Sequence, residues 1–307
     1  MSRDRRCLRS RREVIRTLAL AGMGGFVLPP TLVPILGAAT QDPHLAVVHG
    51  ADARAVTRAA ITALGGMRRF VSRGDVVLVK PNIGWARAAA QGANTNPEVV
   101  AAVVELCLEA GAKIVKVADH TLDMPDRCYT RSGIKAAAER AGARVEQVDP
   151  TRFRTMAVGG EFMKDWEVYA DAMEADKRIN VPTAKHHSLC RMTAAMKNWF
   201  GMLGGQRDRL HRQIHTSIAD MAIFFRPHLT VLDATRVLMR NGPQGGSLAD
   251  LQRMDIVAAS TDQVAIDAFA ATLLGIVPGE VGYIAEGHAR GLGEMRLDRL
   301  RVVKQSI

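Results

Sequence analysis

The sequence predicts an α/β fold: a mostly parallel sheet built from βαβ units, with helices on both faces. After residue 40, apolar runs of strand length alternate with segments of helical periodicity, which is the pattern that βαβ units produce. The run at 75–80 has an unbroken apolar centre, as expected for a parallel strand covered on both faces. The 307 residues are 48% hydrophobic and 23% charged, a composition typical of a soluble globular protein.

The predicted elements follow one another without an internal repeat or a low-complexity linker, so one domain over residues 40–307 is the simplest interpretation. Asn96 is suited to be an N-cap, Pro97 the first helical residue and Gly111 the end of that helix. Residues 150–213 are less regular than the rest. The predicted helices cover 53–71, 97–110, 134–141, 216–225 and 263–274. The predicted strands cover 44–49, 75–80, 113–119, 144–148, 177–181, 229–233 and 255–259.

Residues 1–39 are predicted to be a twin-arginine signal peptide. Arg11 and Arg12 precede a moderately apolar stretch, and the small residues 37–39 close it, in the charged, apolar, cleavable order of such signals. Interrupting glycines and prolines argue against a stable membrane span, which needs about 20 apolar residues. We therefore expect the Tat export machinery as a partner and a periplasmic or otherwise exported location. A cytoplasmic protein with a basic extension and a retained anchor are the alternatives.

The basic net charge does not indicate a nucleic-acid partner. Half of the formal charge of +10 comes from residues 1–39, which hold seven arginines against two acidic residues. The rest is spread without a basic run, and aromatic residues make up 5% of the chain, too few for a base-stacking surface.

The four cysteines exclude a self-contained iron–sulfur or zinc-ribbon motif. Cys7 lies in the leader, and no two of Cys107, Cys128 and Cys190 have C-x-x-C spacing. These three allow at most one disulfide, and Cys107 lies in an apolar helical run typical of the core.

Polar residues collect where the predicted strands end, which predicts a shared cleft at the carboxyl edge of the sheet. Four exits contribute, with Lys80 and Asn82, Asp119 and His120, Lys185 with His186 and His187, and Asp233.

Three further stretches are candidates for ligand contacts. Neighbouring histidines on an extended chain point to opposite faces, so one of His186 and His187 is expected to face the site. His211 and His215 would share a face if their segment is helical, a spacing that suits two metal ligands. Asn241 and Gly242 open a turn whose glycines allow close backbone approach, although a plain turn explains them equally well. Asp262 suits a helix cap, and Asp267 needs a partner if buried.

The same stretches resemble the uncharacterised family DUF362. The resemblance rests on residues 77–82 with 95–97, residues 180–185 with His187 and 197–201, residues 229–233 with 241–246, and residues 259–267. It implies the same α/β domain and strengthens the polar site candidates, with His211 similar to a later family histidine, but it implies no reaction. Many members carry an appended four-cysteine iron–sulfur module that this sequence lacks. The residues that it strengthens are Lys80, Asn82, Lys185, His187, Lys197, Asn198, His211, Asp233 and Asp267.

The sequence thus predicts an exported enzyme that binds a small anionic substrate or cofactor in a Lys/His/Asp cleft. The catalytic candidates are Lys185, His187, Lys197 and Asp233, with Asp233 orienting a histidine. The substrate-binding candidates are Lys80, Asn82, Asn198, Asn241 and Gly242. The cofactor is not identified, and a divalent metal held by His187 and His211 is an open hypothesis. A non-catalytic metal or cofactor carrier and an interaction scaffold are the alternatives.

Overall fold

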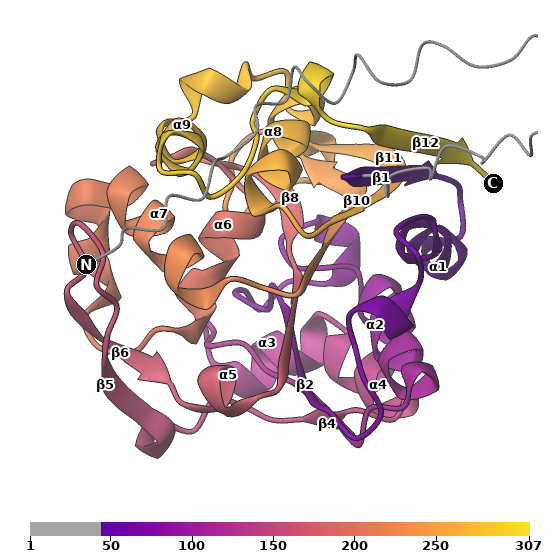
Figure 1. Ribbon diagram of the computed structural model, residues 1–307, viewed down its shortest axis with the longest axis horizontal. Helices are drawn as coiled ribbons and strands as arrows, with labels where there is room; N and C mark the ends of the chain where they lie inside the picture. Colours follow the sequence, from indigo (N-terminus) through magenta and orange to yellow (C-terminus); the bar gives the residue numbers. More distant parts are fainter. Residues whose placement is uncertain (1–43) are drawn as a thin grey trace, which may run out of the picture. The chain divides into compact units, whose positions relative to one another are not determined.

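The computed structural model describes residues 44–307, which form an α/β domain around one ten-stranded sheet (Figure 1). The predicted signal peptide and the boundary at residue 40 lie outside the described residues. The main path of the sheet runs β12-β1-β11-β10-β7-β2-β3-β4. Its strands are β1 (Leu45–His49), β2 (Val76–Pro81), β3 (Ile114–Val117), β4 (Arg144–Val145), β7 (Lys177–Val181), β10 (Leu229–Leu238), β11 (Leu251–Ser260) and β12 (Val302–Ser306).

The sheet is mostly parallel, as predicted. The neighbours from β10 through β7, β2 and β3 to β4 all pair in parallel, and β12 is parallel to β1. The long strand β11 is antiparallel to both β10 and β1. Consequently the carboxyl ends of β2, β3 and β7 meet at one edge of the sheet.

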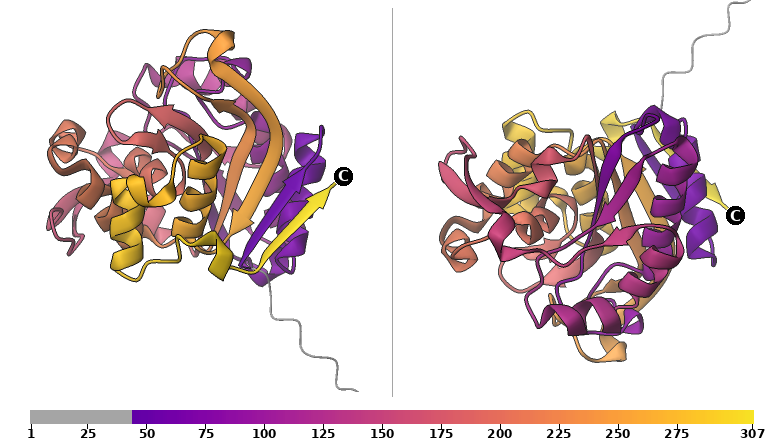
Figure 2. Two further views of the ribbon diagram at one scale, coloured as in Figure 1. Left: turned by 90° about the horizontal axis from the view of Figure 1, so that it is seen from above. Right: turned by 90° about the horizontal axis from the view of Figure 1, so that it is seen from below.

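Helices cover both faces of the sheet (Figure 2). Each face has its own apolar core. One core lies beneath α1 (Ala53–Ala63), α2 (Pro97–Ala110), α3 (Pro125–Arg131) and α4 (Ile134–Arg140). The other lies beneath α5 (Asp171–Glu174), α6 (Ala195–Asn198), α7 (Ile214–Phe225), α8 (Gln263–Leu273) and α9 (Gly282–Ala289). Among residues 44–307, no helix combines the length and apolarity that crossing a membrane requires.

Local chemistry sets several element boundaries. The Asn96 side chain accepts from Glu98 N at the start of α2, and Gly111 ends that helix with a φ of 104°. The prediction of one helix over 53–71 is wrong beyond Ala63, because Gly65 and Gly66 adopt φ values of 96° and 82° that end α1.

The irregular middle contains strands that the sequence analysis missed. β5 (Phe153–Ala157) and β6 (Asp165–Tyr169) form a separate antiparallel pair, and β8 (Thr183–His187) pairs with both β9 (Arg191–Thr193) and β10. The sequence did not predict β8, because its polar residues interrupt the apolar run by which a buried strand is recognised.

Candidate functional site

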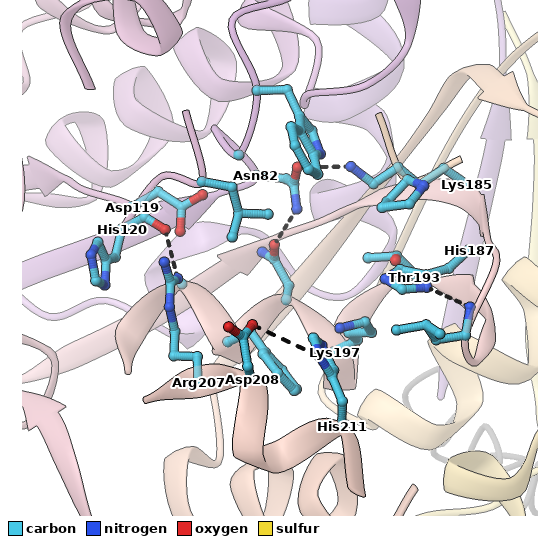
Figure 3. Close-up of a pocket in the computed structure, with 18 of the residues that line it drawn as sticks. Asn82, Asp119, His120, Lys185, His187, Thr193, Lys197, Arg207, Asp208 and His211 are labelled. Atoms are coloured by element: carbon cyan, nitrogen blue, oxygen red, sulfur yellow. Dashed lines mark hydrogen bonds and ion pairs between the residues drawn. The ribbon is translucent and has the colours of Figure 1, made fainter. Parts of the chain in front are cut away.

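A cavity of about 690 Å³ lies at the carboxyl edge of the parallel strands (Figure 3). Its volume is within the range of about 300–1,000 Å³ that small-molecule sites occupy. Three of the four predicted strand exits supply its walls. These contributions are Lys80 at the end of β2 with Asn82 just beyond it, Asp119 and His120 after β3, and Lys185 and His187 on β8.

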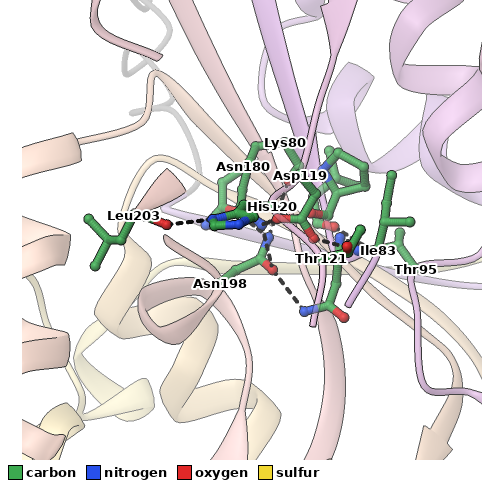
Figure 4. A network of polar contacts seen from close by, with 12 residues as sticks. Lys80, Ile83, Thr95, Asp119, His120, Thr121, Asn180, Asn198 and Leu203 are labelled. Atoms are coloured by element: carbon green, nitrogen blue, oxygen red, sulfur yellow. Dashed lines mark hydrogen bonds and ion pairs between the residues drawn. The ribbon is translucent and has the colours of Figure 1, made fainter. Parts of the chain in front are cut away.

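The β2–β3 end of the cavity holds a buried ion pair. Lys80 Nζ lies 2.6 Å from Asp119 Oδ1, and the two side chains are 1% and 3% exposed. Asp119 also accepts from Ile83 N at 2.6 Å through its other oxygen, while Lys80 donates to Asn198 Oδ1 at 3.2 Å (Figure 4). Gly201 packs against this pair, since a Cβ there would stand 1.7 Å from Asp119 Oδ1. The chain therefore neutralises this lysine itself.

A ladder of amides connects this ion pair to the rest of the site. Asn198 donates to Asn180 Oδ1 at 2.8 Å and accepts from Asn82 Nδ2 at 3.0 Å, and Asn82 Oδ1 accepts from Lys185 Nζ at 3.1 Å. Asn82 and Asn198, both predicted to bind substrate, thus line the cavity and also fix its lysines.

The opposite end of the cavity carries lysines without a carboxylate partner. Lys185 is buried and donates to Asn82 Oδ1 and to Ala93 O at 2.5 Å. Lys197 is 7% exposed, and its Nζ lies 3.8 Å from the centroid of the Phe200 ring; within residues 44–307, no hydrogen bond or ion pair reaches it. Burial lowers the pKa of both amines, that of Lys185 to about 7.

Hydrogen bonds to the backbone assign the tautomers of two histidines that line the cavity. His187 Nδ1 accepts from Leu189 N at 3.2 Å, which leaves the ring proton on Nε2 as a donor. Burial, with Lys197 and Lys185 nearby, lowers the pKa of His187 to about 3, so this ring is neutral at neutral pH. His120 Nδ1 instead bonds Leu203 O at 2.7 Å, which places the proton on Nδ1 and leaves Nε2 as an acceptor.

Arg207 is a cavity residue that sequence reasoning missed. It begins the 3-10 helix η5 (Arg207–Gln213) after the irregular segment 203–206, and it donates to His120 O and Thr121 O, both at 3.1 Å. No motif marks it, because its place at the cavity depends on the path of that segment. With it, five lysine and arginine side chains line the cavity against two aspartates, Asp119 and Asp208.

The mouth of the cavity is less polar than its floor. Leu122, after β3, and Leu189, in the β8–β9 turn, are 60% and 59% exposed although both line the cavity. Trp85 and Pro243 add further apolar surface. A ligand whose anionic group reaches the floor would therefore place its remaining atoms against apolar side chains.

Asp267 supports the site from behind. Its fully buried carboxylate accepts from Ala195 N at 2.5 Å and from Met196 N at 3.0 Å, at the start of the short helix that carries Lys197 and Asn198. These backbone donors are the partner that its burial required. Asp262 caps α8 by accepting from Ala265 N, as predicted.

The predicted catalytic role of Asp233 does not fit the structure. The strand was expected to end at this residue, but β10 continues to Leu238, so Asp233 lies within the strand and does not line the cavity. Its carboxylate accepts from Asn96 N at 2.7 Å and from Thr235 N and Oγ1 at 2.9 and 2.7 Å. Asp233 therefore anchors the start of α2 and does not orient a histidine.

Asn241 and Gly242, predicted to bind substrate, also do not line the cavity. Asn241 donates to Asp250 Oδ2 at 2.8 Å, and Gly242 N donates to His186 Nδ1 at 3.2 Å. Their neighbour Pro243 reaches the cavity wall. His186 faces this turn and His187 faces the cavity, as the alternation along an extended strand predicted.

The predicted pair of His211 and His215 is separated. His211 lies in η5, stacks on Phe200 and lines the cavity, whereas His215 lies in α7, where its Nδ1 accepts from Tyr283 N. Because the chain changes from 3-10 to α-helix between them, they do not share a helix face. Of the predicted metal ligands, His187 and His211 both line the cavity. Among the described residues, no three His, Cys, Asp or Glu side chains form a group that could hold a metal ion.

The structure is an α/β protein with a cavity, lined by five lysine and arginine side chains, at the carboxyl ends of parallel strands. The family model for the "domain of unknown function (DUF362)" matches residues 77–272, and the chain belongs to this family. A thylakoid-associated protein of Synechocystis is 29% identical over 253 residues, which cover 76% of this chain and 74% of the relative.

Two solved structures share a distant likeness. A structure from Thermotoga maritima has a TM-score of 0.47 at 11% identity over 73% of this chain, and the lactate racemase apoprotein from Thermoanaerobacterium thermosaccharolyticum has 0.43 at 10% identity over 71%. The chain spans 60% and 54% of these two proteins, respectively.

Proposed function

We propose that this domain binds a small carboxylate or phosphate compound in the cavity and acts on it as an enzyme. The observation that carries the proposal is Lys197, whose buried amine faces a cavity and has no anionic partner among residues 44–307. Burying a cation without a counter-charge costs several kcal/mol, so a ligand that supplies the charge is strongly favoured. Lys185 and Arg207 add to the positive potential on the same walls.

Two histidines that line the cavity, both with pKa values lowered by burial, give it a hydrogen-bond donor and a proton acceptor. His187 presents an Nε2–H donor and His120 an Nε2 acceptor, as their backbone bonds require. Such a pair can polarise one atom of a bound anion through the His187 Nε2–H and remove a proton from another atom with the His120 Nε2. This supports catalysis over the alternative of a carrier, which needs the cationic floor alone.

Calorimetric titration with carboxylates and phosphate esters, on the protein and on Lys197→Met, tests the proposal. A hydrogen bond to a charged group contributes about 1.5–3 kcal/mol, so Lys197→Met should weaken binding by about ten- to a hundredfold. Lys135→Met, at an exposed position of α4, is the control with the same change in charge. Equal loss in both variants would mean general screening and would contradict the site. Stoichiometric binding without turnover of any bound compound would favour the carrier.

We also propose that the chain is exported by the twin-arginine route. The Ser10-Arg11-Arg12 motif and the apolar stretch after it support this proposal. The relative described as thylakoid-associated is compatible with a site of action at a membrane surface. Replacing Arg11 and Arg12 with lysines should retain the protein in the cytoplasm on cell fractionation, and unchanged export would refute the route.

A further inference from the structure

Lys185 has a hydrogen-bonding arrangement that anion binding does not explain. Its Nζ donates to Asn82 Oδ1 at 3.1 Å and to Ala93 O at 2.5 Å, and both acceptors are neutral carbonyl oxygens. The amine also lines the cavity. Two hydrogens directed at the wall leave the remaining tetrahedral position of the nitrogen for the cavity. On a neutral amine that position is the lone pair.

The contrast with Lys80 shows what this arrangement permits. Asp119 lies 2.6 Å from Lys80 and stabilises its ammonium form. In the described part of the chain no carboxylate forms an ion pair with Lys185, which is 1% exposed. Burial, with Lys197 and Lys80 nearby, lowers the pKa of Lys185 and so favours the neutral amine, which is the form that attacks carbonyl carbons.

His187 is placed to assist such an attack. It is two residues from Lys185 on β8, so both side chains project from the same face of the strand, and both line the cavity. Its Nδ1 is occupied by Leu189 N, so Nε2–H is the group that it offers to a bound compound. This neutral donor can give a hydrogen bond to the hydroxyl group that must leave as water.

We propose that Lys185 forms an imine with a small carboxylate that also carries an aldehyde or ketone, such as a 2-oxo acid. The inference rests on the anion-binding function proposed above, with Lys197 and Arg207 holding the carboxylate. The Lys185 nitrogen bonds to the carbonyl carbon and gives a carbinolamine after proton transfer to the oxygen. The C–O bond then breaks while His187 Nε2–H donates a hydrogen bond to the departing oxygen. The second hydrogen of the Lys185 nitrogen transfers to that oxygen, so water leaves and the neutral imine remains.

Borohydride trapping with pyruvate and with glyoxylate tests the imine on the intact protein. The hydride adds to the imine carbon, so mass spectrometry should show the mass of the oxo acid less one oxygen atom. Peptide mapping should place this adduct on Lys185, a result that needs no variant. Lys185→Arg should lose the adduct, while the exposed-site control Lys135→Arg should retain it at the wild-type level.

The outcomes separate this inference from the binding proposal. An adduct on Lys185 supports the imine. An adduct on Lys197 or on exposed lysines overturns it, and so does the absence of an adduct with both oxo acids. If the oxo acids bind in calorimetry but no adduct forms, the anion site stands and the imine is wrong. If neither they nor the other anions bind and no adduct forms, both proposals fail.

Discussion

The two ends of the cavity hold lysines in opposite electrostatic circumstances. Lys80 is paired with Asp119 at 2.6 Å, whereas Lys197 has the ring of Phe200 as its neighbour and no carboxylate within the described chain. Both amines are largely buried, so burial alone does not distinguish them. The difference indicates two roles. The ion pair of Lys80 and Asp119, with Asn198 bonded to Lys80, holds β2, the residues after β3 and α6 together. Lys197, which has no carboxylate partner in the described chain, is available to a ligand.

Removing the ion pair of Lys80 and Asp119 should have the largest effect on the free energy of unfolding. Asp119→Asn leaves the Lys80 ammonium without its counter-charge at 1% exposure, which should lower the free energy of unfolding by about 3–5 kcal/mol. Urea denaturation measures the loss. Asp298→Asn, at an exposed position, should change stability by less than about 0.5 kcal/mol. Equal effects in the two variants would show that the ion pair does not stabilise the fold.

Asp267 holds the helix that carries Lys197, and its contribution to the free energy of unfolding should depend on pH. Burial raises the pKa of Asp267 from 3.8 to about 7, so the folded protein binds more protons than the unfolded chain between these values. The contribution of Asp267 to stability is therefore full at low pH and falls as pH rises from about 4 to about 7.

Asp267→Asn tests this sign. The amide can accept only one of the two backbone hydrogen bonds, so the variant should be less stable than the wild type by about 1–3 kcal/mol at about pH 5. The difference in the free energy of unfolding between the wild type and the variant should become smaller towards about pH 8, where the Asp267 carboxyl of the wild type is deprotonated. Thermal unfolding at both pH values would show this, and a gap that widens with pH would contradict the raised pKa.

A methyl group at Gly201 should move Lys80 and Asp119 apart without removing a charge. The added Cβ would stand 1.7 Å from Asp119 Oδ1 and 2.7 Å from Lys80 Nζ, so the pair must move apart. We expect Gly201→Ala to cost about 1–3 kcal/mol in chemical denaturation. Gly246→Ala is the matched control, because no atom lies within 4 Å of its Cβ position. A loss in the control as large as that in Gly201→Ala would refute the steric explanation.

Removing the charge of Lys197 should have the smallest effect on the stability of the ligand-free protein. Lys197→Met loses the contact with Phe200 but also loses an uncompensated buried charge, so stability should change by about 1 kcal/mol or less. Differential scanning calorimetry with and without a bound anion checks this expectation. The ligand-induced rise in Tm should disappear in the variant, and a large loss in the free protein would show that Lys197 is structural.

Much of the fold could be predicted because local sequence encodes it. The apolar run that became β2 and the Asn96–Pro97 start of α2 were both confirmed, since caps and apolar periodicity act within a few residues. The alternation of βαβ units also predicted that Lys80, Asp119 and Lys185 would meet, because parallel strands end at the same edge of a sheet.

The sequence by itself thus determined the parallel centre of the sheet, the helices α1, α2, α4, α7 and α8, and most of the charged groups at its carboxyl edge. Only the tertiary structure decided which of these groups face the cavity. Contrary to the prediction, Asp233 does not line the cavity, because β10 continues to Leu238. Arg207 does line it, without having been predicted, because the segment after Gly201 folds back over His120. The physical reason is that strand length and loop path depend on contacts with distant residues, here Asn96 for Asp233 and His120 for Arg207.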